Sequence, residues 1–90
     1  MPTTPPIQPL TLALIEIYGP AEGPRAAAVM LPGILQDFTS MLQAAANGNR
    51  VTEEYKTEDL RAAITLTGYK DKKGNTKIDG ITVNGKRLSI

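Results

Sequence analysis

The clearest pattern of apolar and polar positions along the chain lies between Pro32 and Asn47. Apolar side chains recur there at the three- and four-residue spacing of one helical stripe, namely at Ile34, Leu35, Phe38, Met41, Leu42 and Ala45. Pro32 suits the first turn of a helix, and Gly48 is a usual stop after the last turn. The pattern predicts an amphipathic helix over residues 32–47.

Two shorter apolar stretches precede this helix. Leu10–Tyr18 contains consecutive apolar residues, which predict a strand that is covered on both faces. A loop with two Gly-Pro pairs follows and leads to Arg25–Leu31, where two interpretations stay open. We favour a second strand that pairs with the first. The alternative is one long helix kinked at Pro32, because Ala27 and Leu31 continue the helical spacing.

The last third of the chain predicts three short strands. Ile64–Tyr69 alternates between apolar and polar residues, as expected of a half-buried strand, and Lys77–Val83 is a second strand. Asn84-Gly85 is the strongest hairpin signal in the sequence, because both residues tolerate the positive φ that a tight turn requires. Lys86–Ile90 is expected to return as the last strand.

The remaining segments are polar or rich in proline. Arg50–Asp59 is expected to be a connection that ends in a helical turn over Leu60–Ala63. Lys70–Asn75 is expected to be a charged turn, and Gly80 to mark a β-bulge. Four prolines in Met1–Pro9 predict an extended, flexible arm.

These elements predict the α+β class, with one amphipathic helix packed on a small antiparallel sheet. The expected order is β-β-α-β-β-β, in a single domain over residues 10–90 that follows the Pro-rich arm at residues 1–9. A helix and a sheet each have one apolar surface to cover, so packing them together is the economical arrangement.

The chain contains no histidine and no cysteine. This excludes Ser–His and Cys–His nucleophilic catalysis, thiol redox chemistry and ordinary zinc sites. The acid pairs Glu53-Glu54 and Glu58-Asp59 lie in a polar stretch, so their pKa values are expected to be ordinary. We therefore expect no enzyme, no metal and no cofactor. The expected function is that of a binding or assembly protein, such as an adaptor, inhibitor or structural subunit, acting through protein–protein contacts.

Two loops contain residues that are typical of ligand sites but match such sites poorly. Gly19 and Gly23 are too closely spaced for a phosphate-binding loop of the Walker A type. Asp71, Asn75 and Asp79 have the spacing of calcium ligands, but the lysines between them would repel a cation. Neither loop predicts a ligand site.

Positive charge is concentrated after residue 61, where six cationic residues face only two aspartates, a local charge of +4 in a chain of net charge +1. The cationic residues are Lys70, Lys72, Lys73, Lys77, Lys86 and Arg87. They are candidate contacts to nucleic acid or to an acidic partner, so a small nucleic-acid-binding protein is the alternative function. A meander of the last strands would divide this charge between two ends of the sheet.

Leu88, Ser89 and Ile90 form an apolar strand that could pair with a partner or with a second copy of the chain. We therefore expect a homo-oligomer, of which a two-fold dimer is the commonest form. The first residues do not have the pattern of a secretory signal, and the longest apolar run is far shorter than a membrane span. A cytoplasmic protein without membrane contact is expected.

Overall fold

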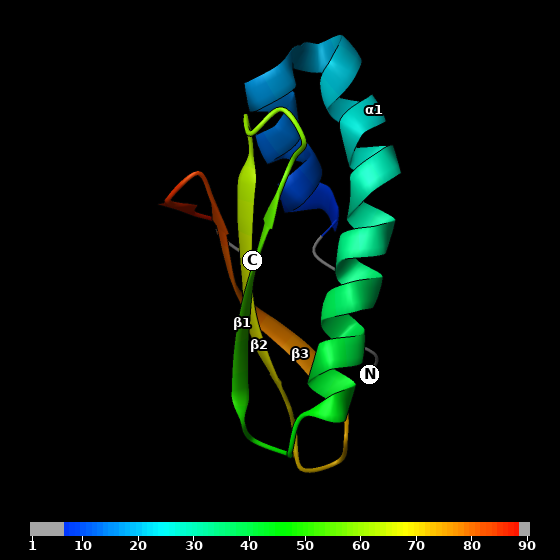
Figure 1. Ribbon diagram of the computed structural model, residues 1–90, viewed down its shortest axis with the longest axis vertical. Coiled ribbons are helices and arrows are strands. Elements are labelled where there is room, and N and C mark those ends of the chain that lie inside the picture. Colours follow the sequence, from blue (N-terminus) through cyan, green and yellow to red (C-terminus); the bar gives the residue numbers. More distant parts are fainter. Residues whose placement is uncertain (1–6, 89–90) are drawn as a thin grey trace.

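The computed structural model describes residues 7–88, in which one long helix precedes a four-stranded antiparallel sheet (Figure 1). The elements are α1 (Ile7–Ala44), β1 (Arg50–Lys56), β2 (Ala63–Lys70), β3 (Thr76–Val83) and β4 (Lys86–Arg87). The strands lie side by side in the order β1-β2-β3-β4. The predicted α+β class is confirmed. The predicted order β-β-α-β-β-β is wrong, because the helix comes first and all the strands follow it.

Helix α1 reverses direction at Gly19, which has non-helical backbone angles (φ 94°, ψ 169°). Glycine adopts a positive φ at little cost, and Pro20 suits the first turn of the segment that follows. The two segments, residues 7–18 and 20–44, return against one another (Figure 1). At their contact, a Cβ atom on Gly23 would overlap the backbone of Ile15. The helical hairpin therefore depends on glycine at both positions.

The predicted strand over Leu10–Tyr18 is wrong, since these residues are helical. Leu10, Ala13 and Leu14 are buried, and Ile17 and Tyr18 are half-buried. That spacing is the stripe of a helix packed on one side. A continuous apolar run fits either element, and here the contact with the second segment selects the helix.

The favoured strand over Arg25–Leu31 is also wrong, and the alternative of a long helix is correct in outline. The backbone angles stay helical through Pro32. Pro32 cannot donate a hydrogen bond to the carbonyl of Ala28, but both residues are exposed to solvent. The helix predicted over residues 32–47 is confirmed as far as Ala44.

Strand β1 occupies the stretch that was expected to be a connection. Val51, Glu53 and Tyr55 are half-buried, while the residues between them are exposed. Only two of the inward residues are apolar, which explains why the sequence lacks a clear strand pattern. The helical turn expected at Leu60–Ala63 is also wrong, because Leu60 has a positive φ of 59° within a turn and β2 begins at Ala63.

Strands β2 and β3 match their predictions closely. Their register shifts at Gly68, which pairs with Ile78, whereas Thr67 pairs with Gly80. Asp79 is thus the extra residue of a bulge, next to the glycine expected to mark it. A side chain on Gly68 would collide with the carbonyl of Lys77, so glycine is required at this crossing.

The turn between β3 and β4 is the predicted Asn84-Gly85 hairpin, with φ values of 51° and 81°. Asn84 also ties the turn to the start of β2. Its Oδ1 accepts a hydrogen bond from the Ala63 amide at 2.8 Å, and its Nδ2 donates to the Arg61 carbonyl at 2.9 Å.

The core lies between α1 and one face of the sheet. It contains Leu10, Ala13, Leu14, Ala27, Leu31, Leu35, Phe38, Leu42, Ala62, Ile64, Leu66, Ile81 and Val83. The opposite face is polar. There the hydroxyls of Thr52 and Thr67 lie 3.1 Å apart, and Arg50 crosses the ring of Tyr69 to form an ion pair with Asp79 at 2.6 Å. Within residues 7–88, no helix has the length and apolar character needed to cross a membrane.

The expected N-terminal arm is described only in part. Helix α1 begins at Ile7, so residues 7–9 are helical rather than extended. Residues 1–6 lie outside the described part of the chain.

Replacing Gly23 by alanine is expected to lower the free energy of unfolding by about 1–3 kcal/mol, because the new methyl group overlaps Ile15. The matched control is Gly33→Ala in the same helix, where a Cβ has open space around it. This control is expected to raise stability by about 0.5–1 kcal/mol. The free energies of unfolding of both variants can be measured by urea unfolding, followed by circular dichroism. Equal effects of the two substitutions would contradict the close helix contact.

Candidate binding groove

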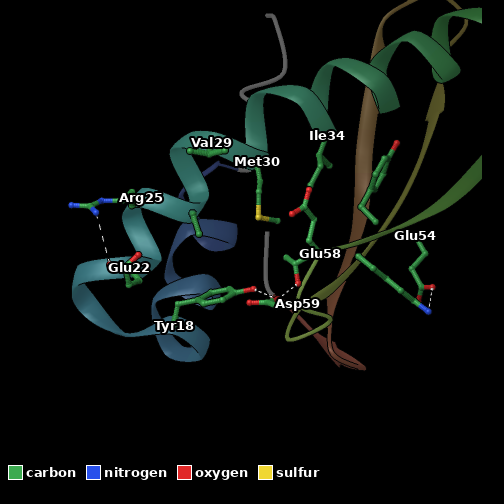
Figure 2. Close-up of a pocket in the computed structure, with 13 residues that line it drawn as sticks. Tyr18, Glu22, Arg25, Val29, Met30, Ile34, Glu54, Glu58 and Asp59 are labelled. Atoms are coloured by element: carbon green, nitrogen blue, oxygen red, sulfur yellow. Dashed lines mark hydrogen bonds and ion pairs between the residues drawn. The ribbon is translucent and has the colours of Figure 1, made fainter.

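A groove of about 810 Å³ runs between α1 and the end of β1 (Figure 2). One wall is formed by residues 18–34 of α1, and the other by the end of β1 and the loop that follows it. The lining residues are Tyr18, Glu22, Arg25, Ala26, Val29, Met30, Ile34, Glu54, Tyr55, Lys56, Thr57, Glu58 and Asp59. The groove is open to solvent.

Part of the helix wall is apolar. We call the apolar residues of this wall, Ala26, Val29, Met30 and Ile34, the apolar floor. Met30 and Ile34 project from α1 toward the loop that carries Glu58 and Asp59 (Figure 2). Val29 is 78% exposed, while the other three floor residues are half-buried. The core stripe of α1 passes through neighbouring positions, and Met30 and Ile34 pack against it with part of their surface still exposed in the groove.

Two tyrosine–aspartate hydrogen bonds join α1 to β1 and to the loop that follows it. The Tyr18 hydroxyl donates to Asp59 Oδ1 at 2.8 Å, and the Tyr55 hydroxyl donates to Asp37 Oδ2 at 2.7 Å. In the first bond the tyrosine lies on α1, and in the second it lies on β1. The two bonds thus fix the separation of the walls.

The loop after β1 is held by hydrogen bonds around Thr57, the one polar residue that is buried in the described part of the chain. Its hydroxyl donates to Asp59 Oδ1 at 2.6 Å and accepts from the Ala62 amide at 3.2 Å. Arg61 extends back to α1, where its Nη2 donates to the Ile17 carbonyl at 2.8 Å and its guanidinium lies over the ring of Tyr18. The groove wall is therefore ordered by its own contacts.

The protonation states of the groove are set by these hydrogen bonds. The Thr57 hydroxyl, the Arg61 amide and the Tyr18 hydroxyl all donate to Asp59, and they hold the pKa of its carboxyl below its ordinary value. The expectation of ordinary carboxyl pKa values is thus wrong for Asp59. Partial burial and the bond to Asp37 raise the pKa of Tyr55 far above its ordinary value. Near neutral pH, Asp59 is ionised and Tyr55 is protonated.

The lining has an excess of negative charge. Four carboxylates, which we call the acidic rim, face two cations: the rim comprises Glu22, Glu54, Glu58 and Asp59. Arg25 lies 3.9 Å from Glu22, and Lys56 lies 3.6 Å from Glu54. Within residues 7–88, Glu58 forms no ion pair or hydrogen bond, and the lining as a whole has a formal charge of −2.

The basic residues singled out from the sequence do not form one patch. Lys72 and Lys73 lie in the turn between β2 and β3, whereas Lys86 and Arg87 lie on β4. The two groups are at opposite ends of the sheet (Figure 1).

The other two basic candidates, Lys70 and Lys77, already interact with residues of the same chain. Lys70 Nζ donates to the Gln43 carbonyl at 2.8 Å, and Lys77 Nζ lies 3.9 Å from Asp71. Asp71 itself accepts hydrogen bonds from turn amides, chiefly that of Asn75, and these lower the pKa of its carboxyl. This aspartate therefore stabilises the turn, and its oxygens are used there.

The proposed edge residues are only partly described. Leu88 is half-buried against the core, and its amide donates to the Ile81 carbonyl at 2.9 Å. Ser89 and Ile90 lie outside the described residues.

Sequence reasoning missed the groove, because its residues come from separate stretches without a motif. Val29 and Met30 were the available signal, since they are apolar but lie beside the predicted stripe, whereas Ile34 was predicted to lie on the stripe and is only half-buried. In the described part of the chain, no three acidic residues are grouped closely enough to hold a metal ion. Comparisons with protein-family models, with curated proteins and with solved structures found no significant match to this chain.

Replacing Tyr55 by phenylalanine is expected to lower the free energy of unfolding by about 1 kcal/mol at neutral pH, because the bond to Asp37 is lost. The stability that Tyr55 contributes is present below its ordinary pKa of 10.0 and is lost as pH rises above that value, since ionisation then favours the unfolded chain. The difference between the wild type and Tyr55→Phe should therefore shrink in alkaline urea titrations.

The matched control is Tyr69→Phe on the outer face of the sheet. In the described structure the Tyr69 hydroxyl makes no hydrogen bond, so this substitution should leave neutral-pH stability nearly unchanged. Equal stabilities of the two variants at neutral pH would show that the Tyr55–Asp37 bond contributes nothing to folding.

Proposed function

We propose that this chain is a small non-enzymatic binding protein that holds a protein partner in the groove between α1 and β1. The observation that carries the proposal is the apolar floor, which faces the edge strand of the sheet across an open groove. Apolar surface beside a few polar groups of fixed orientation is typical of binding sites.

The groove chemistry supports binding rather than catalysis. A general acid or base needs a pKa close to the working pH, whereas the pKa of Asp59 is lowered and that of Tyr55 is raised away from neutrality. Glu22 and Glu54 are each next to a cation, and the chain has no histidine or cysteine to act in their place. These groups give the groove a constant charge and a constant shape near neutral pH.

The charge distribution supports a protein partner over nucleic acid. The groove is acidic, and an acidic surface repels phosphates. The cations that could bind a phosphate backbone are divided between two ends of the sheet, although such binding requires several of them acting together. The predicted homo-oligomer stays a prediction.

The proposal can be tested by selecting ligands for the full chain from a random-peptide library. Val29→Glu places a charge on the apolar floor without disturbing the core, because Val29 is 78% exposed. Selected peptides are expected to lose about tenfold or more in affinity for this variant, which corresponds to about 1.4 kcal/mol. Fluorescence anisotropy with labelled peptides measures the loss.

The matched control is Leu12→Glu, which introduces the same charge at an exposed apolar helix position outside the groove. Binding to this control is expected to equal that of the wild type. If no peptide is selected, or if the selected peptides bind Val29→Glu as well as Leu12→Glu, the groove is not the binding site.

A further inference from the structure

We propose that the partner segment is an extended, basic chain that joins the sheet beside β1 as an additional strand. This inference rests on the proposed function and specifies the chemistry of the partner. It is drawn from three observations: β1 is an edge strand, the apolar floor lines the same groove as the end of β1, and the rim of the groove is acidic.

The backbone of β1 is paired on one side only. All seven of its residues, Arg50–Lys56, are in register with β2, and β1 lies at the end of the strand order. In an antiparallel ladder, alternate residues direct their amide and carbonyl groups away from the partner strand. These outward groups are a template for another strand, which is the usual liability of a sheet edge.

The groove adds side-chain contacts to this backbone template. It is lined both by the end of β1 and by the apolar floor of α1, so a chain that lies along this end of β1 would meet Met30 and Ile34 on one of its faces. An extended chain directs alternate side chains to opposite faces. Apolar residues at every second position would therefore pack on the floor, as in other cases of strand addition.

The acidic rim determines which charge is favoured in the partner segment, at the positions between its apolar residues. Glu54 is an exposed residue of β1, and Glu58 and Asp59 follow just beyond the end of the strand. Cross-strand pairs of opposite charge stabilise a sheet, whereas like charges opposite one another destabilise it. A lysine or arginine beside Glu54 and Glu58 is therefore favoured, and an acidic segment is disfavoured.

The same charges argue against a second copy of this chain in the groove. A two-fold dimer through β1 would use the same surface patch on both copies. Because such pairing is antiparallel, it would place the Glu53-Glu54 stretch of one copy beside that of the other, in the middle of both strands. The groove therefore fits a basic segment of a different protein better than its own edge.

A synthetic peptide of seven residues that alternates lysine and valine, the length of β1, is the direct probe. It should bind the full chain with an affinity that decreases as salt increases. A lysine–serine peptide lacks the apolar side chains, and a glutamate–valine peptide reverses the charge. Both are expected to bind about tenfold more weakly or worse. Equal binding of the three peptides would contradict the inference.

Charge-reversal variants locate the contact on the protein. Glu58→Lys is expected to weaken binding of the lysine–valine peptide about fivefold, and its matched control Glu16→Lys, an exposed glutamate outside the groove, should have little effect. Alternate amides of the peptide can be N-methylated in two ways, at the odd or at the even positions. One of these two peptides should no longer bind, because methylation removes the amide donors that face β1. Equal effects of Glu58→Lys and Glu16→Lys, or no effect of N-methylation at either set of positions, would overturn strand addition.

The failure of this inference differs from the failure of the proposed function. If library peptides require Val29 but are acidic or helical, the groove binds a partner of another kind and only the strand inference is wrong. The same holds if sedimentation velocity shows self-association that Val29→Glu abolishes, because a second copy then occupies the groove. If no ligand depends on Val29, both proposals are wrong.

Discussion

Close contact between the two segments of α1 is the constraint on which the rest of the structure depends. Gly19 supplies the positive φ that reverses the chain, and Gly23 allows the returning segment to touch the backbone at Ile15. Both segments contribute fully buried leucines to the single core. A helical layer of this width covers the apolar face formed by β2 and β3, which one short helix would leave partly exposed to water.

The groove follows from the way this layer meets the sheet. The core stripe of α1 passes through Leu31, Leu35 and Phe38, so Met30 and Ile34 lie on its flank, toward β1. The two tyrosine–aspartate bonds join the walls at a fixed separation, and the Thr57 network orders the loop at one end.

Local chemistry allowed the second half of the fold to be predicted better than the first. Ile64–Tyr69 alternates strictly, and Asn84-Gly85 specifies its own turn, so neither depends on distant residues. Leu10–Tyr18 is apolar on nearly all sides, and only its contact with the second helical segment decides which face is buried. The groove was not predictable for the same reason. Its walls combine α1 with Arg50–Lys56, whose polar edge position hides the strand pattern.

If a partner strand adds to β1 as proposed, the acidic residues of this edge strand would both protect it and make it selective. An unpaired edge invites other strands, and proteins commonly oppose this with charged side chains. Glu53 and Glu54 disfavour pairing between two copies, because like charges would meet. A basic segment would not be repelled in this way, and its cations would be attracted to Glu54 and Glu58. A single set of carboxylates would thus exclude the most abundant wrong partner, another copy of the chain, and favour the proposed one.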